Sequence, residues 1–223
     1  MEPPPVRLNS VGWFCQAGLR ALKWWPAKMF GTTLGMGLFF VGYFWVLRHP
    51  ASPVTVMPLT RMDRLVGFHA GALPLYLSLW LYVSLVPALL VDRRELVAYV
   101  LAAGALSLAG LTLFYLWPTT APKAGIDWSQ HPSLAFLQSV DASGNACPSL
   151  HVAFAVFTAV WLERLLQQMG AGRLGHMLNG LWVLGILYST VAIRQHVVLD
   201  VLAGAGLGLG VAAANLRMLR LFA

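Results

Sequence analysis

Charged residues are scarce in this chain. Asp, Glu, Lys and Arg make up 10% of its 223 residues, against about 25% in an average soluble domain. Hydrophobic residues make up 58% of the chain, and the mean hydropathy is +0.70. These values exclude an ordinary water-soluble domain, because the polar residues are too few to cover its surface. The composition therefore indicates a membrane protein.

Cysteine is scarce as well, with only Cys15 and Cys147 in the chain. Two cysteines supply neither a disulfide framework nor a cysteine-rich zinc site. We also expect these two residues on opposite faces of a bilayer, which argues against their pairing. The sequence therefore gives no support to cysteine chemistry.

Acidic residues are few, since 8 Asp and Glu stand against 15 Lys and Arg, for a formal net charge of +7. In a soluble chain this balance would suggest a nucleic-acid partner. Here the basic residues stand at the ends of apolar runs, where anionic lipid headgroups meet them. We therefore expect membrane lipids, and not nucleic acid, as partners.

Long apolar runs are what the sequence has in abundance. A hydrocarbon core of about 30 Å needs roughly 20 apolar residues in a helix. Runs near this length, each bounded by charge, proline or a polar cluster, cover roughly 29–47, 70–91, 96–117, 149–168, 177–194 and 197–215. We predict an all-α polytopic membrane protein with six transmembrane helices in one bundle.

The segment before the first run mixes aromatic and basic residues. Trp13, Phe14 and Trp25 are interleaved with Arg20 and Lys23, as suits a helix lying along a membrane surface. We therefore predict an amphipathic, interfacial N-terminal segment over residues 1–28 and a six-span domain over 29–223.

The basic residues also predict an orientation. In a six-span arrangement, the side that holds both termini carries ten Lys and Arg residues and the other side carries five. Because basic residues concentrate on the cytoplasmic side, we expect both termini in the cytoplasm of a bacterium, with the protein in its inner membrane. The long loops then face outward.

The longest polar connection, roughly 118–148, runs into Cys147-Pro148-Ser149-Leu150-His151 at the head of the fourth run. Proline suits the first turn of a helix, where the backbone amides near Ser149 to His151 favour an anion. The alternative is an ordinary helix start with an interfacial histidine.

A second group of polar residues lies at the start of the sixth run. His196 and Asp200 are four residues apart, so on a helix they share a face and Asp200 can hold one ring nitrogen. This is how a nucleophilic or basic histidine is oriented. A carboxylate at membrane depth is also costly and marks a functional site. The alternative is a purely structural His–Asp pair.

Both groups, Ser149 with His151 and His196 with Asp200, are expected on the extracytoplasmic side, near the basic residues Lys123 and Arg194. Two imidazoles with cations around them suit a phosphate ester, because one ring attacks phosphorus while the other protonates the leaving oxygen. A metal site is disfavoured, since the spacing of His196 and Asp200 is unusual for zinc and no further Cys or Glu ligand is close in sequence. We expect no metal and no other cofactor.

These two motifs together resemble those of the type 2 phosphatidic acid phosphatase superfamily, over about residues 110–210. The resemblance implies a six-span fold and a metal-independent reaction through a phosphohistidine. It implies His196 as the nucleophile, Asp200 as its orienting partner and His151 as the acid for the leaving group. The phosphate cradle would comprise Ser149 with the neighbouring amides, including that of Leu150, together with Lys123 and Arg194.

Departures from the family pattern bear on the substrate. Lys123 is the match to the family's first motif, Thr190 stands where many members carry an arginine, and Leu150 stands where phosphatases carry glycine. This pattern is more similar to the inositol phosphorylceramide synthase branch. The motifs do not distinguish water from an alcohol as the acceptor; we predict a lipid phosphatase, with a headgroup phosphotransferase that uses an alcohol acceptor as the alternative. The third hypothesis is a non-enzymatic membrane protein that keeps the fold.

The loop before the second run carries Arg61, Asp63 and Arg64. We expect these charged residues either to contact a lipid headgroup or simply to be solvated.

Overall fold

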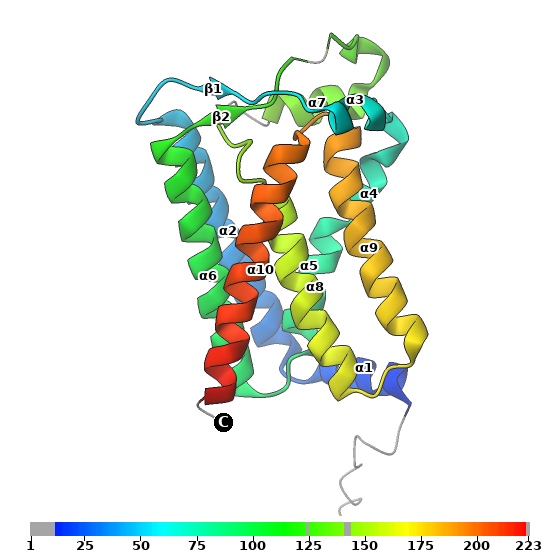
Figure 1. Cartoon of the computed structure of the whole chain (residues 1–223). Coiled ribbons are helices and arrows are strands. Elements are labelled where there is room, and N and C mark those ends of the chain that lie inside the picture. The colour runs from blue at the N-terminus through cyan, green and yellow to red at the C-terminus, as the bar shows by residue number, and fades with distance from the viewer. Residues whose placement is uncertain (1–11, 124, 141–143, 222–223) are drawn as a thin grey trace, which may run out of the picture.

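The computed structural model describes residues 12–123, 125–140 and 144–221 of the chain. Long helices run side by side through most of it (Figure 1). Six of the helical segments are long and apolar enough to cross a membrane. They are α2 (Trp25–Arg48), α4 with α5 (Leu73–Leu77 and Leu79–Leu89), α6 (Arg93–Leu116), α8 (Leu150–Gln168), α9 (Arg173–Ala192) and α10 (Val198–Leu221). The predicted all-α, six-span bundle is confirmed.

The helix ends differ from the ends of the apolar runs. α2 begins at Trp25 instead of 29, and α10 continues to Leu221 instead of ending at 215. α6 begins at Arg93 because the Asp92 carboxylate accepts a hydrogen bond from the backbone N–H of Glu95. Capping groups, and not hydrophobicity, set where such a helix starts.

The second span is built from three consecutive pieces. A short 3₁₀ turn, η2 (Ala70–Ala72), leads into α4, and Ser78 separates α4 from α5. Pro74 stands near the start of α4, where a missing N–H is tolerated. The break places the backbone carbonyl of Tyr76, at the end of α4, beside the start of α8.

α8 is the central helix of the bundle, since it packs against α5, α6, α9 and α10. Trp161, Phe157 and Leu165 are fully buried on it. The outer helices instead leave large apolar side chains exposed, as helices that face lipid do. The first residues of α8 are therefore held near the axis of the bundle.

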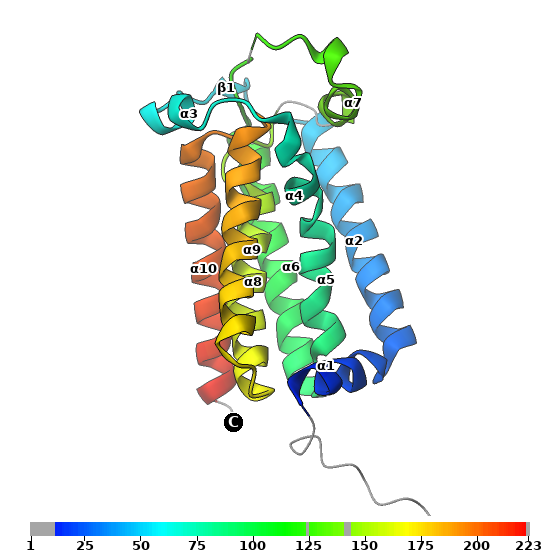
Figure 2. The ribbon, with the colours of Figure 1, turned by 90° about the vertical axis from the view of Figure 1, so that its right-hand side faces the viewer.

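α1 (Trp13–Leu22) lies across one end of the bundle, the end at which α10 also finishes (Figures 1 and 2). The Gln16 side chain donates a hydrogen bond to the carbonyl of Met169 at 3.3 Å. Phe14 and Leu22 on the same helix stay exposed. A helix therefore precedes the first span, over Trp13–Leu22, within the segment predicted to be amphipathic; residues 1–11 of that segment lie outside the described residues.

The opposite end of the bundle carries the long connections. It holds β1 (Thr55–Val56), β2 (Thr119–Thr120), α3 (Arg61–Val66), η3 (Trp128–Gln130) and α7 (Pro132–Val140) (Figures 1 and 2). β1 and β2 pair in parallel, with Thr55 opposite Thr119, and Thr119 also bridges to Asn145. Three segments that are distant in sequence are therefore joined beside the starts of α8 and α10.

Candidate active site

His196 lies in the turn between α9 and α10, and hydrogen bonds hold the backbone of this turn. The N–H of His196 donates to the carbonyl of Thr190 at 3.1 Å. The N–H of Val197 donates to Asp200 Oδ2 at 2.9 Å, and the N–H of Val198 donates to Asp63 Oδ1 at 2.7 Å. With its backbone fixed on both sides, His196 has a defined position.

The imidazole of His196 is itself oriented. Its Nδ1 lies 3.0 Å from the carbonyl oxygen of Ala146 and 3.6 Å from Asp200 Oδ2. A carbonyl only accepts, so Nδ1 carries the proton, and in the neutral ring Nε2 keeps the lone pair. The sequence predicted Asp200 as the group that holds this ring; in the structure the carbonyl makes the shorter contact, and Asp200 adds a nearby negative charge.

Asp200 connects the starts of two spans. Its side chain is fully buried. Asp200 is the third residue of α10, and its Oδ2 accepts a hydrogen bond from the N–H of Val197, as acidic residues at this position of a helix commonly do. Its backbone carbonyl accepts from the N–H of Ser149 at 3.0 Å. Asp200 therefore joins the beginning of α10 to the beginning of α8.

The start of α8 carries the remaining predicted residues. Ser149 is fully buried, and its hydroxyl accepts from the N–H of Val152 at 3.3 Å as the helix cap. The side chain of Leu150 packs against Gly110 of α6 and points into the bundle. The amides of Leu150 and His151 occupy the first two helical positions, which have no partner within a helix. Leu150 can therefore contribute its backbone amide, but not its side chain, to the predicted phosphate cradle.

His151 is half-buried, and its ring is stacked on Tyr76 with 3.9 Å between the ring centroids. Its Nε2 lies 3.0 Å from the Tyr76 carbonyl oxygen, so Nε2 carries a proton. His151 lies within electrostatic range of His196. The structure therefore brings the two predicted histidines to the same end of the bundle, His151 at the start of α8 and His196 in the turn before α10.

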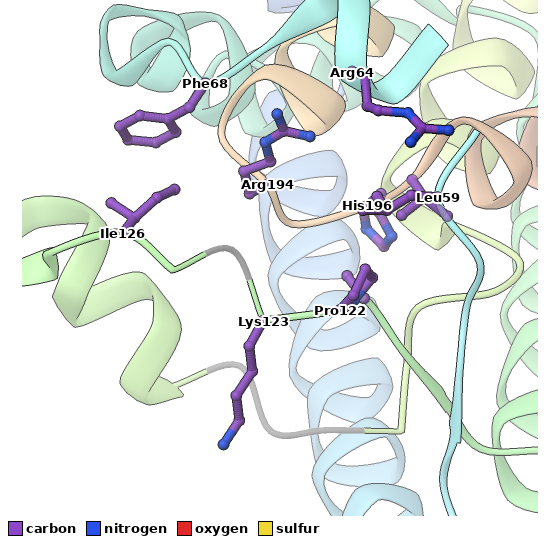
Figure 3. Close-up of a pocket in the computed structure, with 10 residues that line it drawn as sticks. Leu59, Arg64, Phe68, Pro122, Lys123, Ile126, Arg194 and His196 are labelled. Carbon is purple, nitrogen blue, oxygen red and sulfur yellow. The ribbon is translucent and has the colours of Figure 1, made fainter. Parts of the chain in front are cut away.

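A pocket of about 240 Å³ opens beside His196 (Figure 3). Its cationic lining residues are Arg64, Lys123 and Arg194. The other lining residues are apolar, and among the described residues no Asp or Glu lines it; they are Leu59, Phe68, Ala121, Pro122, Ile126 and Val197. Cations in a concave site without neighbouring carboxylates attract anions. The pocket is therefore suited to a phosphate group.

The three cations are placed differently. Arg194 is half-buried, has a left-handed backbone conformation (φ 63°), and donates from Nη1 to the carbonyl of Asp63 at 3.0 Å. Lys123 is exposed, and Figure 3 shows its side chain extending away from His196. Arg64 is exposed and comes from α3, in a different part of the chain. The three residues therefore line one pocket, and the Lys123 side chain points away from the histidine in it.

Asp63 has neither of the roles that the sequence suggested, since it is fully buried and neither faces a headgroup nor is solvated. It forms a capping box with Thr60 at the start of α3. The spacing of Thr60 and Asp63 is a recognised sign of such a cap, so the local contact was visible in the sequence. The contact of Asp63 with Val198, which is 135 residues away, could not be predicted from the sequence.

Cys147 lies beside the site but is chemically protected. It is buried, and burial together with the negative charge of Asp200 raises the pKa of its thiol to about 11. At pH 8 only about one such thiol in a thousand is a reactive thiolate. Cys15, on α1, is exposed.

We therefore expect a maleimide reagent at neutral pH to modify Cys15 and to leave Cys147 unmodified in the folded protein. Intact-mass measurement on the C15S and C147S variants checks this: C15S should take up no label until it is denatured. Rapid labelling of folded C15S would contradict the buried position of Cys147.

The described residues contain no group of three His, Cys, Asp or Glu side chains close enough together to hold a metal ion. No curated protein and no solved structure matches the chain significantly. The family model described as PAP2 superfamily matches residues 94–222, a segment that contains His151, His196 and Asp200. Members of that superfamily are phosphatases and phosphotransferases that act on phosphorylated substrates. The chain is therefore a member of the PAP2 superfamily.

Proposed function

We propose that this protein is an integral membrane lipid phosphatase that hydrolyses a lipid-linked phosphate through a phosphohistidine on His196. The observation that carries the proposal is the environment of this ring. Its Nδ1 is bound to the Ala146 carbonyl, while the ring lines a pocket that also contains three basic side chains. A neutral imidazole held in this tautomer has its Nε2 lone pair available for attack.

In the first step, Nε2 of His196 forms a bond to phosphorus as the bond from phosphorus to the lipid oxygen breaks. The leaving oxygen takes a proton from Nδ1 of His151, which starts the cycle as an imidazolium with its second proton, on Nε2, held by the Tyr76 carbonyl. Arg194 and Arg64 offset negative charge on the phosphoryl oxygens. The amides of Leu150 and His151 supply further donors at a positive helix end.

In the second step, water attacks the phosphohistidine and the bond from phosphorus to Nε2 breaks. His151, now neutral at Nδ1, takes a proton from that water, and inorganic phosphate leaves. Both histidines return to their starting states, so the net reaction is hydrolysis of the ester. An alcohol in place of water would give a headgroup phosphotransferase, the alternative that the sequence resemblance favours.

The lipid character of the substrate and the side of the membrane are supported by the position of the pocket. It lies at the end of the spans, and apolar side chains such as Leu59 and Phe68 stand next to its cations. This pairing suits a phosphate attached to an apolar chain. The ten-to-five distribution of basic residues supports an extracytoplasmic position for this end.

The direct test incubates the purified protein in detergent with a panel of labelled lipid phosphates, with and without alcohol acceptors. We expect release of inorganic phosphate, inhibition by vanadate and no loss of activity with chelators. Mass spectrometry identifies both the donor and the product.

Other outcomes of the same assay point elsewhere. A product in which the phosphoryl group is attached to the added alcohol would show a phosphotransferase. Inactivation by chelators would show a metal-dependent reaction. Absence of both phosphate release and an acid-labile phosphoprotein would favour a non-enzymatic protein.

A further inference from the structure

Asp63 stands outside the segment that matches the family model, which covers 94–222. It lies on α3, in the connection between the first and second spans, yet its side chain is fully buried against the turn that carries His196. The family motifs do not account for this contact. The part of the chain before the matched segment therefore contributes to the site.

A buried carboxylate is costly unless hydrogen bonds replace its water. Asp63 Oδ1 accepts from the N–H of Val198 at 2.7 Å, and Oδ2 accepts from the N–H and hydroxyl of Thr60 at 2.7 and 2.6 Å. These bonds have the short lengths of charge-assisted hydrogen bonds. The carboxylate also lies at the start of α10, where a helix favours negative charge. Its burial is therefore fully compensated.

The same residue holds the chain on both sides of the proposed nucleophile. Its carboxylate binds Val198, two residues after His196, and its backbone carbonyl accepts from the side chain of Arg194, two residues before. The next residue on α3, Arg64, lines the pocket. A displacement of Asp63 would therefore move the histidine and two of the three cations.

We propose that Asp63 is a positioning residue for the phosphoryl transfer. Its carboxylate sets the backbone that orients His196, and it anchors α3 so that Arg64 stays at the pocket. This inference rests on the proposed function, because it assigns Asp63 a role through His196.

The test is the D63N variant, assayed as the full-length protein on the lipid phosphate that the wild type hydrolyses. The amide keeps one acceptor oxygen and loses the other, so either the Val198 N–H or the Thr60 donors lose their partner. We expect kcat to fall about 10- to 100-fold, because small misplacements of a reacting group cost this much. KM should change far less, because the bond from Arg194 goes to the backbone carbonyl, which Asn retains.

Asp92 supplies a matched control, since it also caps a helix start but is exposed at the other end of the bundle. D92N should keep the wild-type kcat. T60A removes one of the two donors to Asp63 Oδ2, together with the hydroxyl that accepts from the N–H of Asp63, and should lower kcat severalfold in the same direction. Rapid-quench measurement of phosphoenzyme formation should show the slowed step in both D63N and T60A.

A purely structural role predicts a different result: D63N would melt at a lower temperature but would form phosphoenzyme at the wild-type rate in the cold. That result would overturn the inference, and so would an unchanged kcat in T60A if D63N failed to fold. The H196A variant separates this failure from failure of the proposed function. Loss of activity in H196A with full activity in D63N would reject the role of Asp63 alone.

Discussion

Replacing His196 with alanine is expected to lower kcat on a lipid phosphate by about 10⁴-fold or more, and to abolish formation of an acid-labile phosphoenzyme. The size of the effect follows from the loss of the attacking atom itself, which no neighbouring group replaces. Folding should survive, because the ring makes one hydrogen bond to Ala146 while the backbone of the turn is held by other groups. Steady-state kinetics and a phosphoprotein gel on monodisperse protein check this result.

Replacing His151 should be similarly severe on a lipid ester but should depend on the leaving group. An alkoxide leaves only if it is protonated, so loss of the acid costs about 10²- to 10⁴-fold. The aryloxide of an aryl phosphate leaves without a proton, so H151A should still form phosphoenzyme from such a substrate and should then accumulate that intermediate. H196A should fail with both substrates. This difference separates the two proposed roles.

His49 provides the control for both variants. It is exposed at the end of α2, where its Nδ1 contacts the carbonyl of Trp45, and it does not line the pocket. H49A should therefore keep the activity of the wild type. Full activity in H196A and H151A alike would refute the histidine mechanism.

The fold was predictable from the sequence because a membrane imposes length. Apolar runs near spanning length predicted the number and order of the spans. The fourth run was expected from 149 with Pro148 in its first turn, whereas α8 begins at Leu150 and Pro148 precedes its cap, Ser149. Helix ends were less predictable where a charged residue continues the helix. Arg93 belongs to α6 because Asp92 caps that helix, and a run defined by hydrophobicity alone misses this.

The site was predictable only in part. The histidines were visible as motifs at two helix starts, because side-chain type and spacing are properties of the sequence. The group nearest to His196 Nδ1 is the backbone carbonyl of Ala146. Every residue has a backbone carbonyl, so residue type does not indicate which one contacts the ring. Arg64 reaches the pocket through a fold contact between distant segments, and sequence periodicity carries no information about such a contact.

Substitution of Gly204 should lower both stability and activity, because α10 crosses the start of α8 at this residue. A Cβ on Gly204 would lie 2.3 Å from the backbone carbonyl oxygen of Ser149, and backbone cannot rotate away as a side chain does. G204A should therefore push the two helix starts apart and stretch the 3.0 Å bond from the Ser149 N–H to the Asp200 carbonyl. We expect a stability loss of about 1–3 kcal/mol and a fall in kcat of about 10²-fold.

Gly206, on the same helix, is the matched comparison, since a Cβ there would meet no atom within 4 Å. Alanine is the better helix former, by about 1 kcal/mol, so G206A should be at least as stable as the wild type and equally active. The same chemical change thus has opposite expected signs two residues apart, which thermal melting in detergent and steady-state kinetics measure together. Equal behaviour of G204A and G206A would mean that the close approach of α8 and α10 does not set the geometry around His196.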